Sequence, residues 1–177
     1  MNQMASPNFA RNRVYISQGE YRVSGDPSTV IATLLGSCVS ACMWDPEQRV
    51  GGMNHVLFVD DNENGAEIMG HAVNGMELLI NGLVNLGADR RNLRAKVFGG
   101  ASMIEGLSVA GQRNAEFILD FLDREGIQYL GGDTGGVKAR RLEFFPTSGN
   151  ARQKLVSDAL PTETVKPLPG KDSVELF

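Results

Sequence analysis

Alternating apolar and polar positions predict strands in the first part of the chain. Residues 13–23 alternate well enough for a strand with a kink or turn at Gly19. A turn follows, and residues 29–35 form a second, more apolar strand. This second strand ends at two small residues, Gly36 and Ser37, which favour a tight turn.

The pattern then predicts a β-hairpin. A β-rich run at 38–44 is followed by a polar turn at 45–49 and a second apolar run at 53–59. Folding the second run back along the first places a residue near its middle opposite a residue near the start of the first. Cys38 and His55 stand at these two positions, so we expect them to face each other.

Helices and strands share the remainder of the chain. Apolar residues recur at helical spacing at 70–86 and at 114–124, which predicts two amphipathic helices, the second capped by Asn114. Each helix ends at a glycine. Further strands are expected at 93–98, 127–130, 142–145 and 151–156, with a loop at 131–136.

Two groups of strands with two main helices, and no repeating strand–helix–strand rhythm, predict a mixed α/β fold. We expect layered, β-sandwich-like mixed sheets flanked by the two helices. The 177 residues fit one domain that is long enough to bury a core. That domain is expected at 13–156, between a flexible N-terminal segment (1–12) and an extended C-terminal tail (157–177).

Composition and charge narrow the range of partners. The net charge is −4, and no cluster of lysine and arginine is interleaved with aromatic residues, so nucleic acid is not an expected partner. No apolar run approaches the ~20 residues of a membrane span, and the N-terminal residues lack the apolar core of a signal peptide. We therefore expect a cytoplasmic protein without membrane insertion, whose two cysteines stay reduced.

Cys38 and His55 are the strongest candidates for chemistry. A thiol attacks a carbonyl as the thiolate, and because its free pKa is ~8.5 it needs a neighbouring base such as His55. The turn at Gly36 and Ser37 can expose the sulfur and direct backbone N–H groups at an oxyanion. The structural alternative is that Cys38 is a small buried hydrophobic residue and His55 a hydrogen-bonded core residue.

A metal site is the first alternative class of site. Cys38, Cys42, His55 and His71 are the residues that a zinc module would use. In a strand the two cysteines lie about 13 Å apart, whereas zinc holds its sulfur ligands within about 4 Å of each other. We therefore expect no metal.

Two glycine-containing segments resemble other classes of site. The Asp-Thr-Gly triplet at 133–135 is typical of aspartic proteases, but these need two such carboxylates sharing a proton, and the sequence has one copy. The glycines at 99 and 100 resemble a phosphate-binding loop, but no Gly-Lys-Ser/Thr follows them. They are expected instead to permit a sharp turn or a close approach of backbone, and no cofactor is expected.

Several motifs resemble those of the chemoreceptor glutamine deamidases of the CheD family, and they occur in the family's order. Two of them are LLGSC, which ends at Cys38, and GGMNH, which ends at His55. The resemblance spans approximately residues 13–155. Its other motifs are GEY at 19–21, FGGASM at 98–103, QRN at 112–114, and DTGG followed by ARRLEF between 133 and 144.

The resemblance implies a cysteine-hydrolase-like fold and hydrolysis of particular glutamine side chains on methyl-accepting chemotaxis receptors, giving glutamate and ammonia. Cys38 would attack the carboxamide carbon. His55 would hold the thiolate as an ion pair, protonate the departing ammonia and activate the water that hydrolyses the thioester. The family orients this imidazole with a threonine upstream of the cysteine; Thr33 is the expected residue, and an alternative register places Ala32 there.

Substrate contacts are expected near the cysteine and on loops of small and polar residues. A glutamine on a receptor helix needs an open site whose rims approach the helix closely, and glycine permits that approach. The loops at 60–66, 99–102 and 131–136 have this character. The residues expected to contact substrate are Ser37, Gly99, Gly100, Ser102, Asp133, Thr134 and Gly135.

The resemblance also implies partners. These are the cytoplasmic domains of chemoreceptors and, because members of the family bind it, a CheC-like phosphatase. The alternative function is a non-catalytic chemotaxis protein that regulates by binding receptors or such a phosphatase. An intact pair of Cys38 and His55 favours the enzyme over this alternative.

Overall fold

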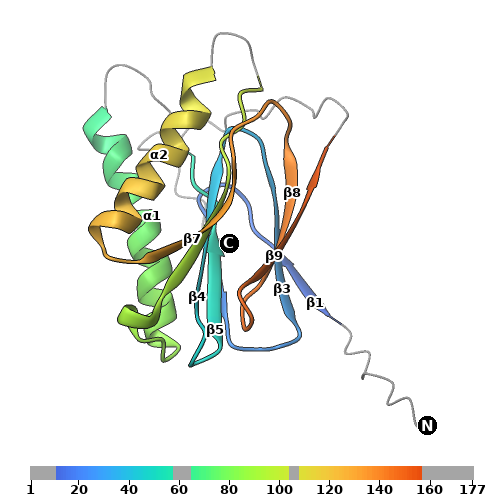
Figure 1. The fold of residues 1–177 in the computed structure, drawn as a ribbon, viewed down its shortest axis with the longest axis vertical. Helices are drawn as coiled ribbons and strands as arrows, with labels where there is room; N and C mark the ends of the chain where they lie inside the picture. The colour runs from blue at the N-terminus through green and yellow to red at the C-terminus, as the bar shows by residue number, and fades with distance from the viewer. Residues whose placement is uncertain (1–10, 58–64, 104–107, 157–177) are drawn as a thin grey trace, which may run out of the picture.

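Two β-sheets packed face to face form the body of the protein (Figure 1). The structure is a computed structural model, which describes residues 11–57, 65–103 and 108–156. In the first sheet, called the four-stranded sheet, one outer pair is parallel and the other neighbours are antiparallel. Its strands, in spatial order, are β1 (Asn12–Tyr15), β3 (Thr29–Leu35), β8 (Arg140–Phe145) and β9 (Asn150–Leu155).

The second sheet has five strands and is also mixed. Its strands, in spatial order, are β2 (Tyr21–Ser24), β5 (Val50–Asn54), β4 (Val39–Asp45), β6 (Arg94–Gly99) and β7 (Gln128–Thr134). β6 and β7 run parallel, and the other neighbours are antiparallel. β4 and β5 form the predicted hairpin, with Cys42 opposite Met53, although the second strand begins at Val50 and not at residue 53 as predicted.

Two helices, α1 (Gly65–Asn85) and α2 (Ser108–Arg124), lie on the outer side of the five-stranded sheet (Figure 1). A short 3₁₀ turn, η1 (Arg90–Asn92), precedes β6. Neither helix, over its described residues, is long and apolar enough to cross a membrane. The helical side chains that pack into this core include Met76, Leu79, Ile80, Leu83, Ile118 and Leu122.

Every residue of β4 is buried, because the strand is covered on both faces. Successive side chains of a strand point to opposite faces. Val39 and Met43 belong to the core beneath the helices. Cys38 and Cys42 belong to the second core, between the two sheets. The strand therefore delivers the Cys38 thiol to the inter-sheet space.

The fold class is confirmed: mixed sheets in layers, with two main helices. The turn expected near Gly19 is present, but it separates two strands, so the prediction of one strand over 13–23 is wrong. β1 and β2 belong to different sheets, and the chain crosses between them at residues 16–20. Gly19 has a φ of +83°, a backbone conformation that residues with a side chain rarely adopt. Glycine therefore permits the crossing at this position.

The predicted loop at 131–136 is wrong for its first half. β7 continues through Gly131 and Gly132 to Thr134, with an irregularity in its pairing opposite Val97. A Cβ atom on Gly132 would lie 1.9 Å from the carbonyl oxygen of Val97, so glycine is required for the strands to pair here.

Asn114 lies within α2 rather than at its start, because the helix begins six residues earlier at Ser108. The predicted first helix is confirmed and begins earlier than predicted, at Gly65. The expected acidic loop at 60–66 lies outside the described residues except at 65–66, which belong to α1, and the segments at 1–10 and 157–177 lie wholly outside them.

Candidate active site

Cys38 follows a tight connection between the two sheets. β3 ends before Gly36, and β4 begins directly after Cys38, so Gly36 and Ser37 make the crossing. The Cys38 side chain is fully buried, which differs from the expected exposed sulfur. The reason is that its strand face is turned toward the four-stranded sheet.

The carbonyl groups around Cys38 are bound by a neighbouring segment. Gly100 N–H donates to the Cys38 carbonyl at 2.8 Å, and Ala101 N–H donates to the Gly36 carbonyl at 2.9 Å. Because both acceptors are held from one side, the connection has a fixed orientation. This brings the FGGASM segment into direct contact with the backbone of the candidate nucleophile.

Helix α2 holds the same connection through Asn114, which is fully buried. The Asn114 side-chain amide donates to the Ser37 carbonyl at 2.8 Å. Within the described residues the Ser37 N–H donates no hydrogen bond. A backbone N–H without an acceptor next to a buried thiol is a candidate oxyanion donor.

The strand register places His55 beside Cys38. Val39 and Val56 exchange two backbone hydrogen bonds, of 2.9 and 2.8 Å, in an antiparallel bridge. Ser40 and His55 therefore form the next opposed pair, and Cys38 lies diagonally from His55 on the same face. Diagonal positions are about 7–8 Å apart, within reach of two side chains.

Thr33 meets His55 across the space between the sheets. Its Oγ1 lies 2.8 Å from His55 Nδ1, and the same hydroxyl donates to the Ile16 carbonyl at 2.8 Å. Because a hydroxyl has one hydrogen, Oγ1 acts as the acceptor for Nδ1–H. The tautomer assigned from this network leaves the Nε2 lone pair of His55 available.

The backbone of His55 is also held, by the crossing segment between β1 and β2. His55 N–H donates to the Glu20 carbonyl at 3.0 Å, and Gly19 N–H donates to the His55 carbonyl at 2.8 Å. The GEY motif thus fixes the position of the candidate base. Ile16, whose carbonyl binds Thr33, lies in the same crossing segment.

Burial lowers the pKa of His55 to about 4, and the negative charge of Glu20 acts in the opposite direction. His55 Nε2 is buried and has no hydrogen-bond partner within the described residues. A neutral imidazole with an open lone pair is suited to act as a general base. This favours a neutral imidazole at rest over the imidazolium of the ion pair that the resemblance implied.

Cys42 and His71 do not join this site. Cys42 lies further along β4, opposite Met53, and His71 is exposed on α1. The described residues hold no group of three or more histidine, cysteine, aspartate or glutamate side chains placed to bind a metal ion. Burial raises the pKa of the Cys42 thiol far above its usual range, opposed by the charge of Lys96.

The two thiols are therefore expected to differ in reactivity although both are fully buried. We expect iodoacetamide to alkylate Cys38 at least about ten times faster than Cys42 at neutral pH, because burial raises the pKa of the Cys42 thiol and only Cys38 borders the connection at Gly36 and Ser37. Peptide mass spectrometry after timed labelling measures both rates in one sample. Equal rates would show that Cys38 is an ordinary buried thiol.

Gly99 and Gly100 are buried, and backbone atoms of other segments occupy the space that a side chain would need at each position. A Cβ on Gly99 would lie 2.2 Å from the Cys38 carbonyl oxygen, and a Cβ on Gly100 would lie 2.6 Å from the carbonyl oxygen of Gly111 on α2. These glycines thus admit the protein's own backbone. Their expected role as an open rim for a receptor helix is corrected accordingly.

Gly99→Ala is expected to destabilise the protein by about 3 kcal/mol or more, because its φ of +113° and the overlap with Cys38 both oppose a side chain. Gly126→Ala is the matched control. Its φ is +65°, but nothing lies within 4 Å of the added Cβ, so we expect a loss of about 1–2 kcal/mol. Urea unfolding measures both, and equal losses would contradict the close approach.

Asp133 joins the two sheets rather than standing free. Arg140 is 2% exposed. It forms an ion pair with the Asp133 carboxylate at 3.0 Å and donates a hydrogen bond to the Asp133 carbonyl at 2.5 Å. Gln153 donates to the same carboxylate at 2.5 Å. Burial lowers the pKa of Arg140, and the charge of Asp133 opposes this. The described geometry of Asp133 is that of an inter-sheet clamp.

The other residues expected to contact substrate lie beside this clamp. Arg140 also donates to the Gly135 carbonyl. Gly135 N–H donates to the Gly99 carbonyl at 2.9 Å, and Ser102 N–H donates to the Gly136 carbonyl at 2.8 Å. Thr134 pairs with Gly99 at the end of β7. The structure therefore brings the DTGG and FGGASM segments together beside Cys38.

Comparison with known proteins gives the family. The model of the family described as CheD chemotactic sensory transduction matches residues 59–155. A probable chemoreceptor glutamine deamidase CheD from Acidiphilium cryptum is 45% identical, with 98% of this chain and 97% of that protein covered. The chain belongs to the CheD family. A probable chemoreceptor glutamine deamidase CheD from Caulobacter sp. strain K31 is 48% identical, over 89% and 85% of the two chains.

Two solved structures resemble the chain weakly. NMB0706 from Neisseria meningitidis aligns with a TM-score of 0.47 and 11% identity, over 71% of this chain and 64% of that one. The hypothetical protein YfiH from Bacillus licheniformis gives 0.43 and 15%, over 64% and 49%. The chain thus spans about half the length of the second of these proteins.

Three residues that build the site were not identified as part of it from the sequence. They are Ile16, Asn114 and Arg140. The last two stand in motifs shared with the CheD family, QRN and ARRLEF, which was the available signal. Ile16 contributes a carbonyl group, which any residue can supply, so its identity carried no signal.

Proposed function

We propose that this chain hydrolyses the side-chain amides of specific glutamines on chemoreceptors to glutamate and ammonia, through a thioester on Cys38. The observation that carries the proposal is the arrangement of His55, with Nδ1 on Thr33 and Nε2 open on the face of Cys38. A base, its orienting group and a thiol are what amide hydrolysis by a cysteine requires. The curated relatives' names supply the substrate class.

In the first half of the proposed reaction, His55 Nε2 takes the proton of the Cys38 thiol as sulfur attacks the carboxamide carbon. The carbonyl oxygen becomes an oxyanion, which backbone N–H groups of the connection at Gly36 and Ser37 bind. Such a donor commonly contributes about 3–4 kcal/mol. The imidazolium then gives its proton to the amide nitrogen, the C–N bond breaks, and ammonia leaves.

In the second half, water replaces ammonia. His55 Nε2 removes a proton from the water as its oxygen attacks the thioester carbon, and collapse of the intermediate breaks the C–S bond. The receptor side chain leaves as glutamate, and the returned proton restores the Cys38 thiol. Thr33 holds the ring through Nδ1 in both halves, so Nε2 stays the reacting nitrogen.

The substrate contacts and partners form part of the same proposal. Ser37, Ser102, Thr134 and Gly135 contact the glutamine or the adjacent receptor helix, while Gly99, Gly100 and Asp133 act by holding these segments. The domain at 13–156 carries the activity and works in the cytoplasm on the cytoplasmic domains of receptors. A CheC-like phosphatase is proposed as a second partner, on the family resemblance alone.

The direct test is incubation with the cytoplasmic domain of a chemoreceptor from the same source, followed by an enzymatic assay for ammonia. We expect ammonia release that depends on time and on enzyme concentration. The matched substrate carries glutamate in place of its reactive glutamines and should release none. Equal release from both substrates, or none from either, would contradict receptor deamidation.

Thr33→Val keeps the shape of the side chain and removes the hydroxyl. We expect kcat to fall about 10- to 100-fold with little change in KM, because the Nδ1–H of His55 loses its acceptor and the ring loses its orientation. Thr33→Ser restores the hydroxyl and should recover most of the rate. Thermal unfolding of both variants shows whether they fold, and full activity of folded Thr33→Val would assign the role elsewhere.

A further inference from the structure

The outer face of the four-stranded sheet, the face turned away from the five-stranded sheet, is strongly basic. Within the described chain both helices lie on the other sheet, so neither covers this face (Figure 1). One carboxylate, Glu143, stands among its described cations, although the whole chain has a net charge of −4. The cations are Arg11, Arg13, Arg141, Arg152 and Lys154.

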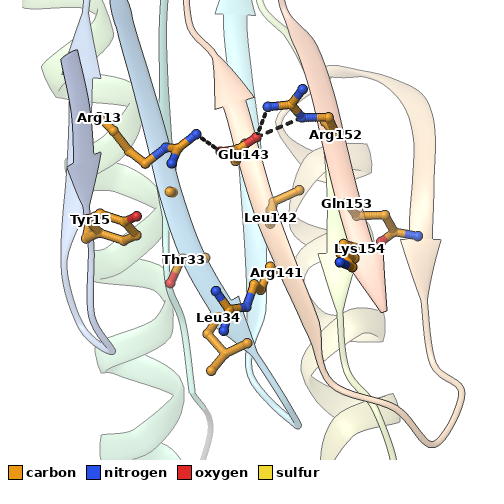
Figure 2. Close-up of a pocket in the computed structure, with 11 residues that line it drawn as sticks. Arg13, Tyr15, Thr33, Leu34, Arg141, Leu142, Glu143, Arg152, Gln153 and Lys154 are labelled. Atoms are coloured by element: carbon orange, nitrogen blue, oxygen red, sulfur yellow. Dashed lines mark hydrogen bonds and ion pairs between the residues drawn. The ribbon is translucent and has the colours of Figure 1, made fainter. Parts of the chain in front are cut away.

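A hollow of about 630 Å³ opens on this face (Figure 2). Its lining includes the small residue Ala32, and two exposed apolar side chains, Tyr15 and Leu34, stand at its margin. Tyr15 is 71% exposed and Leu34 is 37% exposed. A hollow of this size is large enough to seat a side chain of a partner.

The cations differ in whether they are already paired. Glu143 forms ion pairs with both Arg13, at 2.5 Å, and Arg152, so its charge is matched (Figure 2). Arg141 and Lys154 are directly opposed on β8 and β9, and neither has an ion pair within the described residues. Like charges directly opposed across two strands are destabilising, and an anion between them removes that repulsion.

We propose that this face binds an acidic segment of another protein, with carboxylates on Arg141 and Lys154 and an apolar side chain in the hollow between Tyr15 and Leu34. Charge complementarity carries the choice of partner. The concave hollow argues against a membrane surface, which takes a face with protruding apolar residues. The net charge of −4 over the whole chain opposes binding of a long polyanion such as a nucleic acid.

This face is separate from the catalytic space. The Thr33 hydroxyl bonds His55 between the sheets, and the hollow reaches Thr33 from the other side of β3, but its lining includes neither Cys38 nor His55. A partner bound here therefore leaves the space around Cys38 unoccupied. The proposal goes beyond deamidation, since it concerns a partner bound on the outer face of the sheet and not the reaction at Cys38.

Fluorescence anisotropy tests the proposal without any activity assay. The probe is a labelled synthetic peptide in which glutamates flank a central leucine, titrated with the full chain. The comparison probe has every glutamate replaced by glutamine. We expect saturable binding of the acidic peptide that weakens as salt is raised, and at least about tenfold weaker binding of the glutamine peptide.

Paired variants locate the site. Arg141→Gln with Lys154→Gln is expected to weaken binding at least about tenfold while Tm stays the same or rises, because the repulsion between the two cations is removed. Arg22→Gln with Arg94→Gln neutralises two exposed cations on the other sheet and should leave binding unchanged. Leu34→Ser should weaken binding without changing charge.

Four results would overturn the proposal. The first two are no binding of the acidic peptide and equal binding of the glutamine peptide. The third is unchanged affinity in the folded Arg141 and Lys154 variant. The fourth is tighter binding of phosphatidylserine vesicles or of single-stranded DNA than of the acidic peptide, which would assign the face to a different class of partner.

Discussion

Cys38→Ala is expected to abolish receptor deamidation while the protein stays folded. Removing the nucleophile of a catalytic group that acts as a unit costs on the order of 10⁴ to 10⁶ in kcat. Cys38 is fully buried among apolar residues, so alanine leaves a small cavity that costs about 1 kcal/mol. Initial rates of ammonia release, with thermal unfolding of the same samples, measure both effects.

Cys42→Ala is the matched control, because Cys42 is equally buried on the same strand and face. We expect it to lose a similar amount of stability and to keep deamidation close to that of the wild type. A Cys38→Ala variant that retains activity would end the assignment of Cys38 as nucleophile. Loss of activity in both variants with loss of folding would show only a packing role.

His55→Gln is expected to lower kcat by a factor of about 10³ or more, because it removes the general base in both halves of the reaction. It should also change how stability depends on pH. Burial lowers the pKa of His55 to about 4 in the folded protein, against about 6.5 in an unfolded chain. Between these values the unfolded state binds the extra proton, so stability falls as pH falls.

The neutral, buried His55 makes the free energy of unfolding about 3 kcal/mol larger at neutral pH, and this amount is lost progressively as pH falls from about 6.5 through about 4. Urea unfolding at several pH values should show this loss in the wild type and not in His55→Gln, once changes common to both are subtracted. His71→Gln is the control, since His71 is exposed on α1, and it should keep the wild-type profile. A wild-type profile in His55→Gln would contradict the burial of a neutral imidazole.

The hairpin and its pair of residues were predictable because strand periodicity carries register. Side chains alternate along a strand, so the spacing of apolar residues fixes which of them share a face. The turn at 45–49 then set β4 against β5, and Cys38 and His55 fell on one face of adjoining strands. Apolar residues at helical spacing likewise predicted the two amphipathic helices, which pack on the outer side of the five-stranded sheet.

Thr33 and Ala32 were left as alternatives because the choice depends on a contact between sheets. Thr33 and His55 are separated by 22 residues and meet only when the two sheets pack. Neighbouring residues of β3 point to opposite faces, so Thr33 faces His55 while Ala32 lines the outer hollow. That decision belongs to tertiary packing, and no local pattern encodes it.

Arg140 and the glycines of β7 show why the rest was missed. A fully buried arginine is rare, and this one is tolerated because the carboxylate of Asp133 and two carbonyl groups receive the donors of its two terminal nitrogens, while its Nε has no partner within the described residues. Glycines in a sequence are usually taken to indicate a loop, yet Gly132 lies in a strand and is needed for that strand to pass close to Val97. Both features follow from neighbours that are distant in sequence.

The most direct test of the central claim is tandem mass spectrometry of a chemoreceptor's cytoplasmic domain after incubation in ¹⁸O-labelled water with wild type or with Cys38→Ala. The account predicts that specific glutamines become glutamates carrying one heavy oxygen with the wild type, since water hydrolyses the thioester. It predicts unmodified glutamines with Cys38→Ala. Conversion at equal rates with both proteins, or no conversion by the wild type, would contradict it.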